Sequence, residues 1–374
     1  MDDMGNARPL GLYIHIPFCR AKCAYCDFYS LARSEERMDA YAAALTDAFR
    51  AAAPDAAGYT ADTVYFGGGT PSLLGAPRLA ALLEAVRRAF VVAPDAEITF
   101  EANPESARDT DALRLLRDAG FNRISLGMQS ADDDELRAIG RIHSARDTAA
   151  AVDAARRAGF ENLSLDLIYG LPAQTRARWR DNLAAATALA PEHLSCYGLK
   201  VEPGTPLYMR RDSVVLPDDD AQADMYLDTV ELLAAQGYAQ YEISNFARPG
   251  YESRHNLKYW TLGEYLGFGP GAHSDFGGRR FGRARDLDAF LAGKAVLSED
   301  AAPSPQERAA ERVMLGLRTV RGLSTEELAD AAEVLRMCAE RGLAEQSGGF
   351  WRLTPRGFLV SNAIILRVQE ALGL

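Results

Sequence analysis

The chain has 374 residues, of which 48% are hydrophobic and 25% charged, and this ordinary globular composition excludes a largely disordered protein. The length exceeds the ~100 to 200 residues usual for one domain, so we expect one large domain and a smaller one. The formal net charge of −11 argues against nucleic acid or an anionic membrane as a partner, because phosphate binding normally needs a concentrated basic surface.

Neither end of the chain resembles an export or membrane segment. Residues 1–8 include two acidic side chains and lack the basic and then apolar order of a secretory signal. The most apolar late stretch, residues 358–366, is far too short to cross a bilayer. We therefore expect a cytoplasmic protein without an integral membrane segment.

From residue 11 to about 240, short β-rich runs alternate with helical stretches, a pattern typical of βα units around a parallel sheet. No Gly-x-Gly-x-x-Gly turn follows the first run, so an α/β fold with a partial (β/α)6 barrel fits better than a Rossmann sheet. The strand candidates are residues 12–16, 63–66, 98–101, 123–126, 163–168 and 194–200, and the main helix candidates are 34–53, 77–90, 145–158 and 175–188.

The pattern changes beyond residue 240. Residues 241–300 are rich in Gly, Arg and aromatic residues without a clear period, which indicates a loop-rich connecting region. Residues 301–374 predict a helix from about Ser304, a second helix over 325–340, a hairpin of 343–346 and 350–353, and a closing helix capped by Thr354. This order resembles a winged helix.

We therefore divide the chain into a barrel domain (1–240), a connecting region (241–300) and a winged-helix-like domain (301–374). Winged helices often bind DNA, but the nine arginines of this last domain are matched by nine acidic residues. We expect it to pack against the barrel or to bind a partner other than nucleic acid.

Three of the five cysteines lie directly after the first strand candidate. The spacing Cys19-x3-Cys23-x2-Cys26 lets one loop offer three thiolates, which are soft ligands suited to three corners of a 4Fe-4S cluster. A zinc knuckle with its fourth ligand elsewhere and three incidental thiols are the alternatives. Cys196, in a strand-like run, and Cys338, in a helical one, are expected to be core thiols.

The triplet, with Tyr25 before its last cysteine, resembles the radical S-adenosylmethionine (SAM) superfamily. In that family SAM binds the iron left open by the cysteines and is cleaved to a 5'-deoxyadenosyl radical. The resemblance extends to residues 67–71, Gly-Gly-Gly-Thr-Pro, and implies that Gly68, Gly69 and Thr70 approach SAM. Glycines permit such an approach, although a triple glycine alone is more often a plain turn.

The same resemblance implies further SAM contacts, each matched to a short motif of this chain. A carboxylate can accept hydrogen bonds from ribose hydroxyls, and an arginine can pair with the methionine carboxylate. The alternatives are structural polar residues and, for the tyrosine, a strand core residue. The implied contacts are Tyr13, Glu101 of Glu-Ala-Asn-Pro-Glu, Gln129 of Gly-Met-Gln-Ser, Arg141 of Gly-Arg-Ile-His and Asp166 of Leu-Asp-Leu-Ile-Tyr-Gly.

Within the superfamily, the chain resembles the group of HemW heme chaperones and oxygen-independent coproporphyrinogen III oxidases over almost its whole length. Residues 241–247 and the motif His255-Asn-x-x-Tyr-Trp look like the HemW side. This implies that His255 contacts heme, since imidazole is a normal axial ligand, whereas the alternative is a hydrogen-bonded structural histidine. His15 and His273 are weaker candidates. Phe28 stands where the oxidases carry a further cysteine, which also favours HemW.

The resemblance implies a heme chaperone that binds a 4Fe-4S cluster, SAM and heme and passes heme to acceptor hemoproteins, respiratory ones among them. Any peripheral contact with a membrane would come through such a partner. No catalytic residue is assigned. The alternatives are coproporphyrinogen III oxidation, in which the radical takes hydrogen from propionate side chains, and a zinc-stabilised binding protein.

Overall fold

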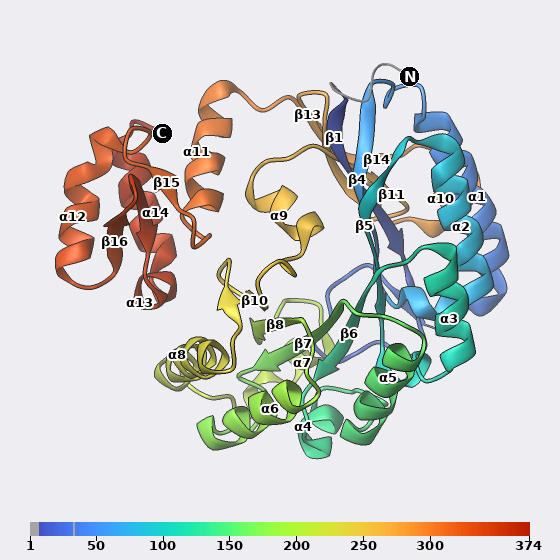
Figure 1. Ribbon diagram of the computed structural model, residues 1–374, viewed down its shortest axis with the longest axis horizontal. Coiled ribbons are helices and arrows are strands. Elements are labelled where there is room, and N and C mark those ends of the chain that lie inside the picture. The colour runs from blue at the N-terminus through green and yellow to red at the C-terminus, as the bar shows by residue number, and fades with distance from the viewer. Residues whose placement is uncertain (1–6, 33) are drawn as a thin grey trace.

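The computed structural model describes residues 7–32 and 34–374. The prediction that the chain starts without a secretory signal rests mainly on residues 1–6, which lie outside this part. One mixed sheet of twelve strands forms the centre of the fold, and a separate three-stranded sheet lies near the C-terminus (Figure 1).

Six adjacent strands of the large sheet are parallel, as the alternating pattern predicts. Their order in the sheet follows the chain, and each neighbouring pair has a parallel register. All six strand candidates overlap them. The strands are β1 (Arg8–Ile16), β4 (Tyr59–Gly68), β5 (Val92–Ala102), β6 (Arg123–Gln129), β7 (Leu163–Tyr169) and β8 (His193–Gly198).

Helices cover the outer face of these strands (Figure 1). Their apolar residues recur every three or four positions, so α1 buries Tyr41, Leu45 and Phe49 along one side. Ser144 and Asp147 form a capping box that starts α5. The helices between β1 and β9 are α1 (Met38–Ala52), α2 (Ala76–Ala89), α3 (Thr110–Ala119), α5 (Ala145–Arg157), α6 (Arg176–Ala188) and α8 (Asp219–Ala235), with the short α4 (Asp133–Ala138) and α7 (Pro206–Met209) near the cysteine loop.

The barrel stays open because β1 and β8 pair with different strands. β1 pairs in parallel with β11 (Tyr265–Phe268), and β8 pairs antiparallel with β10 (Asn245–Ala247). The sheet continues beyond β11 through β12 (His273–Phe276), β13 (Arg279–Arg283) and β14 (Leu297–Ala301), and it ends beyond β10 with β9 (Ala239–Gln240). Helix α9 (Arg254–Trp260) lies between the two edges (Figure 1).

Residues 241–300 are more regular than the predicted loop-rich region. They supply β10 to β14, α9 and α10 (Leu287–Leu291). Each of these elements has only three to seven residues, so a hydrophobic period cannot show in the sequence.

A second hydrophobic core lies in the C-terminal part and includes Leu317, Leu335, Trp351 and Val368. The capped helix at Ser304 and the hairpin are confirmed. Tyr226 of α8 also packs into this core, and the predicted domain boundaries stay predictions. The elements are α11 (Pro305–Gly316), β15 (Leu323–Ser324), α12 (Ala332–Glu340), β16 (Ala344–Ser347), β17 (Phe350–Leu353), α13 (Pro355–Leu359) and α14 (Ser361–Ala371).

The second predicted helix starts later than residue 325. Residues 325–328 form turns and Ala329–Ala331 a short 3-10 helix, with the Ala331 N–H bonded to the Leu328 carbonyl and both side chains fully buried. Leu328 and Ala331 are therefore buried in the core before the helix begins at Ala332. Within the described residues, we find no helix with the length and apolarity that a bilayer crossing requires.

Candidate functional site

A cavity of about 550 Å³ lies at the carboxyl ends of the parallel strands, where ligands bind in α/β folds. Its volume falls in the range of roughly 300–1,000 Å³ typical of small-molecule sites. The structure brings most of the predicted site residues together on its wall. These are Cys19, Cys23, Tyr25, Cys26, Gly68, Gly69, Thr70, Glu101, Gln129, Arg141 and Asp166.

The loop that carries the three cysteines is held at its start and in its middle. It leaves β2 (Phe18–Cys19), which pairs with β3 (Leu31–Ala32). In its middle, the Ala24 N–H donates to the Ile139 carbonyl at 2.9 Å, and the Ala24 carbonyl accepts from the Leu207 N–H at 2.8 Å. The loop is therefore fixed against the ends of α4 and α7, and its three partly buried thiols line one cavity.

The glycine run lies directly against the first cysteine. The N–H groups of Gly69 and Thr70 donate to the carbonyls of Ile16 and Phe18, both at 2.8 Å. A Cβ at Gly69 would lie 2.7 Å from the Phe18 carbonyl oxygen, closer than any side chain tolerates. The Thr70 hydroxyl lies 3.5 Å from the Cys19 sulfur. The run thus positions the cysteine loop, a role beyond the predicted approach to SAM.

A hydrogen-bond chain links the glycine run to the second cysteine. The Asn103 amide donates to the Thr70 hydroxyl at 3.1 Å and accepts from Arg141 Nη2 at 2.7 Å. Arg141 Nη1 lies 3.4 Å from the Cys23 sulfur. This guanidinium therefore holds a positive charge beside a thiol that must be a thiolate to bind iron.

Two carboxyl groups line the cavity from the strands, Glu101 on β5 and Asp166 on β7. Glu101 accepts from the Tyr65 hydroxyl at 2.7 Å and from the Gly68 N–H at 3.0 Å, while burial raises its pKa to about 7. Asp166 accepts from the Ser125 hydroxyl at 3.0 Å, and burial raises its pKa. Both can accept hydrogen bonds from hydroxyl groups of a ligand.

The donor set fits an iron–sulfur cluster. Burial raises the pKa of the Cys26 thiol to about 11 and also raises that of Cys19, so the thiolates need nearby positive charge, which iron supplies. A cubane takes its thiolates at separate corners. Among residues 7–32 and 34–374, we find no group of three or more His, Cys, Asp or Glu side chains close enough together to hold a single metal ion.

Comparison with known proteins agrees with this geometry. The family model for the radical SAM superfamily matches residues 13–186, and that for the HemN C-terminal domain matches residues 304–360. The protein named heme chaperone HemW in Mycobacterium tuberculosis is 39% identical over 96% of this chain and 94% of its own length. HemW of Escherichia coli is 38% identical over 96% and 97%. This chain belongs to the HemW family of radical SAM proteins.

The fold agrees with a solved relative of the HemW family. Coproporphyrinogen III oxidase (HemN) from Escherichia coli, described as a radical SAM enzyme, is 26% identical and aligns with a TM-score of 0.84 over 97% of this chain and 91% of that chain. The predicted α/β radical SAM fold with a smaller C-terminal domain is thus confirmed.

Two residues that the family resemblance implies as ligand contacts, Tyr13 for SAM and His255 for heme, lie away from the cavity wall. Tyr13 is packed inside the barrel, where its hydroxyl bonds His15 Nδ1 at 3.1 Å and its ring stacks on Tyr65. His255 is 1% exposed, with Nδ1 bonded to the Thr63 hydroxyl and Nε2 to the Tyr259 hydroxyl, both at 2.8 Å. In this arrangement neither nitrogen of His255 is free to bind iron.

The HemW-type motif at the start of α9 instead packs against residues inside the barrel. Two backbone N–H groups at the start of α9, those of Arg254 and His255, donate to the buried carboxylate of Glu97 at 3.0 Å. The His255 ring stacks on Tyr65, whose hydroxyl binds Glu101. Helix α9 therefore packs under the cavity, inside the barrel, through His255 and Tyr65. Asn256, which follows His255 in the helix, lines the cavity itself.

Sequence reasoning missed several residues of the wall, namely Asn103, Arg123, Ser125 and Ser195. Asn103 stands two residues after Glu101 in the motif already used for that glutamate, so the motif could have identified it. Arg123 and Ser125 alternate along β6, but the sequence does not show which strand face turns inward.

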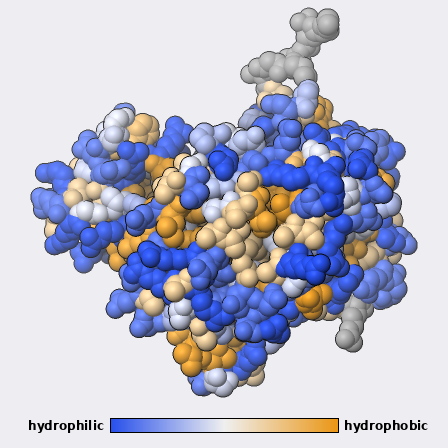
Figure 2. Space-filling model, turned by 60° about the horizontal axis from the view of Figure 1, so that its bottom comes forward, coloured by the Kyte–Doolittle hydropathy of each residue, from blue (hydrophilic) through white to orange (hydrophobic). Residues whose placement is uncertain are grey.

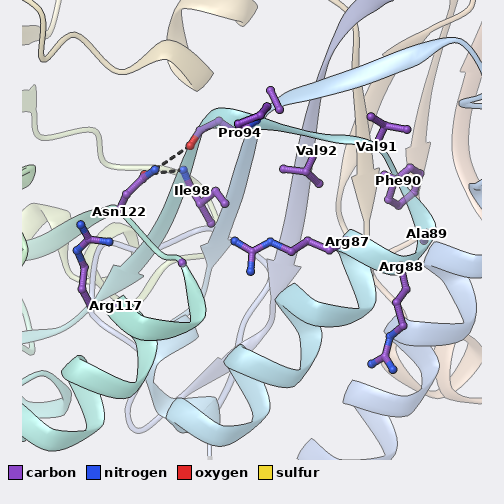
Figure 3. Close-up of a pocket in the computed structure, with 13 residues that line it drawn as sticks. Arg87, Arg88, Ala89, Phe90, Val91, Val92, Pro94, Ile98, Arg117 and Asn122 are labelled. Atoms are coloured by element: carbon purple, nitrogen blue, oxygen red, sulfur yellow. Dashed lines mark hydrogen bonds between the residues drawn. The ribbon is translucent and has the colours of Figure 1, made fainter. Parts of the chain in front are cut away.

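A second hollow, of about 790 Å³, lies at the amino ends of β5 and β6, opposite the cavity (Figure 3). It contains none of the predicted site residues. Its arginines complete neighbouring helix ends: Arg87 donates to the Ala119 carbonyl at 2.6 Å, and Arg117 donates to the Gly159 carbonyl at 3.1 Å. Asn122 bridges the backbone of Ala96 and Ile98 (Figure 3). The polar residues of this hollow therefore have structural roles.

Exposed apolar side chains stand at the carboxyl ends of the strands and in the segments that follow them. Phe28 is 63% and Tyr197 41% exposed, and both line the cavity. Met209, the last residue of α7, is 79% exposed, and Val215, in the loop before α8, is 77% exposed. Figure 2, which turns the bottom of Figure 1 forward, shows hydrophobic surface in the middle of this face with hydrophilic surface around it. Such a surface suits a large apolar ligand or a protein partner.

Proposed function

We propose that this protein is a cytoplasmic heme chaperone that binds a 4Fe-4S cluster, SAM and heme and delivers heme to acceptor hemoproteins. The single observation that carries the proposal is the similarity to proteins named heme chaperone HemW along nearly the whole chain, at 33–39% identity. Respiratory hemoproteins are the acceptors that the sequence resemblance favours, and a peripheral membrane contact would come through them.

The residues of the cavity divide among the ligands by their chemistry. Cys19, Cys23 and Cys26 would hold the cluster, because they are the cavity's only thiols. Arg141 and Gln129 would bind the charged amino-acid end of SAM, and Glu101 and Asp166 would accept hydrogen bonds from its hydroxyl groups. When bound, the cluster and SAM would supply one-electron chemistry.

Tyr25 would shield the cluster, since it packs against the apolar side chains of Ile139, Ile168 and Leu171 beside the cysteine loop. Burial of this ring excludes water from one side of the site. We propose that Tyr13 and His255 act from beneath the cavity, by fixing Tyr65 and through it Glu101.

Oxygen-independent coproporphyrinogen III oxidation is the second candidate, favoured by the structural match to HemN at 26% identity. In the resemblance drawn from the sequence, the oxidases carry a fourth cysteine where this chain has Phe28, whose exposed ring offers no iron ligand. This difference favours the heme-chaperone function over the oxidase activity.

The experiment uses the full chain, purified and reconstituted without oxygen. The chaperone proposal predicts iron and sulfide in cluster proportion, saturable heme binding, and transfer of bound heme to an apo-hemoprotein. Zinc without iron or sulfide would support the zinc-stabilised alternative. Decarboxylation of coproporphyrinogen III without saturable heme binding would overturn the proposal in favour of the oxidase.

A further inference from the structure

Arg123 is the largest charged side chain that the described fold buries completely. It is the first residue of β6, is 1% exposed, and lines the cavity together with Ser125 of the same strand. Residues two apart on a strand face the same side of the sheet, so both point into the barrel. In the register with β5, Arg123 pairs with Thr99, two residues before Glu101. Arg123 therefore enters the cavity from a level below that of Glu101.

The charge of Arg123 has no direct partner in the part of the chain that the structure describes. Its Nε is buried without a hydrogen-bond partner, and no carboxylate of the described residues forms an ion pair with the guanidinium. The three carboxyl groups that face it, Glu97, Glu101 and Asp166, accept hydrogen bonds from other groups. A buried charge without a pair costs stability. Folding therefore does not explain this arginine, and a role in the cavity does.

The charge of Arg123 acts on the two carboxyl groups of the cavity wall, because charges interact strongly in a buried site. Burial raises the pKa of Glu101 to about 7 and raises that of Asp166, and the positive charge of Arg123 opposes both shifts. Glu97 is a further negative charge that faces Arg123. The other titratable groups that face these residues are uncharged at neutral pH, because burial raises the pKa of the tyrosines and the cysteine and lowers that of the histidines. These groups are Tyr13, Tyr25, Tyr65, Tyr197, Tyr241, Tyr259, Cys196, His193 and His255.

An unpaired buried arginine can also indicate a site for an anionic ligand. Around Arg123, however, the three carboxyl groups already supply negative charge. The arginine beside the cysteine loop, where the carboxylate end of SAM is proposed to bind, is Arg141. An ionised carboxyl group accepts hydrogen bonds through both oxygens, whereas a protonated one also donates. The ionisation of Glu101 and Asp166 therefore decides how well the two groups accept hydrogen bonds from ligand hydroxyls.

We propose that Arg123 is a positioning residue for SAM, whose unpaired charge keeps Glu101 and Asp166 ionised so that both accept hydrogen bonds from the hydroxyl groups of the ligand. This inference rests on the SAM site of the proposed function and deepens it, because it adds a residue that acts through the two carboxyl groups without contacting the ligand.

The test is the dissociation constant of SAM, measured by calorimetry on the cluster-loaded full chain at about pH 6.5 and about pH 9. Arg123→Gln removes the charge and should raise the pKa of Glu101 by about 1, which weakens SAM binding roughly eightfold at about pH 6.5 and leaves it nearly unchanged at about pH 9. Arg123→Lys keeps the charge and should follow wild type at both pH values. Arg356→Gln, which removes an exposed arginine of α13, is the control for a lost charge. Each variant is compared with wild type at the same pH, so the titration of the SAM amino group cancels.

The outcomes separate this inference from the proposed function. If wild type shows no saturable SAM binding, the SAM site itself is rejected, and the inference falls with it. If wild type binds SAM and folded Arg123→Gln loses the same factor at both pH values, or none at either, the inference alone is overturned. The same holds if Arg123→Lys loses as much affinity at about pH 6.5 as Arg123→Gln does.

Glu97→Gln tests the inference even if Arg123→Gln does not fold. This change removes the negative charge that faces Arg123, so the pKa of Glu101 should fall by about 1 and SAM should bind about threefold more tightly at about pH 6.5. Unchanged SAM affinity in folded Glu97→Gln would overturn the inference, since the ionisation of Glu101 would then not depend on the charges below it.

Discussion

Replacing Gly69 by alanine tests whether the glycine run builds the cluster site. The added Cβ would lie 2.7 Å from the Phe18 carbonyl oxygen, 2.9 Å from the Ile16 carbonyl oxygen and 3.1 Å from the Cys19 sulfur. The first two atoms accept the backbone hydrogen bonds that hold the run in place, so the segment that carries Cys19 must shift. Overpacking of this kind costs about 1 to 3 kcal/mol. If all of this free energy is lost from cluster binding, the association constant of the cluster falls about 5- to 150-fold.

The matched control is Gly75→Ala, six residues further on. Gly75 has a φ of +86°, but a Cβ there meets nothing closer than 3.9 Å, so alanine brings strain of about 1 to 3 kcal/mol without a clash. Iron and sulfide per chain are measured after reconstitution without oxygen, alongside urea unfolding of the apo-protein. We expect a cluster deficit in Gly69→Ala only. Equal cluster content in two equally destabilised variants would refute the positioning role.

Three further predictions follow from the site. Alanine at any one of the three clustered cysteines should abolish iron and sulfide binding, whereas Cys196→Ala should keep both, and full iron in a clustered-cysteine variant would contradict the assignment. Asn103→Ala removes the link between Thr70 and Arg141 and should raise the SAM dissociation constant roughly tenfold by calorimetry, while the exposed Asn362→Ala should not. Burial raises the pKa of both Glu101 and Glu242 to about 7, so the stability that each contributes is full below about pH 4.5 and is lost as the pH rises through 7. Glu101→Gln should therefore reduce the slope of apo-protein unfolding free energy against pH between 5 and 7 by at most about 1.4 kcal/mol per pH unit, and an unchanged slope in urea titrations would show that Glu101 does not titrate there.

The sequence predicted the regular part of the fold well, because short β-rich runs alternate regularly with longer stretches of helical period. β7, for example, is buried along most of its length, and its helix neighbours repeat at three and four. The pattern did not predict how the sheet ends. Strands β11 to β14 are four or five residues long, and β11 joins them to a strand far along the chain, where Tyr265 pairs with Gly11 of β1.

The site residues divide in the same way. Cys19, Gly69 and Glu101 belong to short motifs whose spacing alone fixes their place at a strand end, so they could be identified. His255 also belongs to a motif, but its role depends on burial and on contacts with Thr63 and Tyr259, which spacing does not show.

The central claim is that this chain carries heme, and the most direct test is an oxygen-free titration of the cluster-loaded protein with ferric heme, followed by mixing with an apo-hemoprotein. The account predicts saturable binding in a fixed ratio and appearance of the acceptor's own heme spectrum. Absence of saturable binding would contradict it.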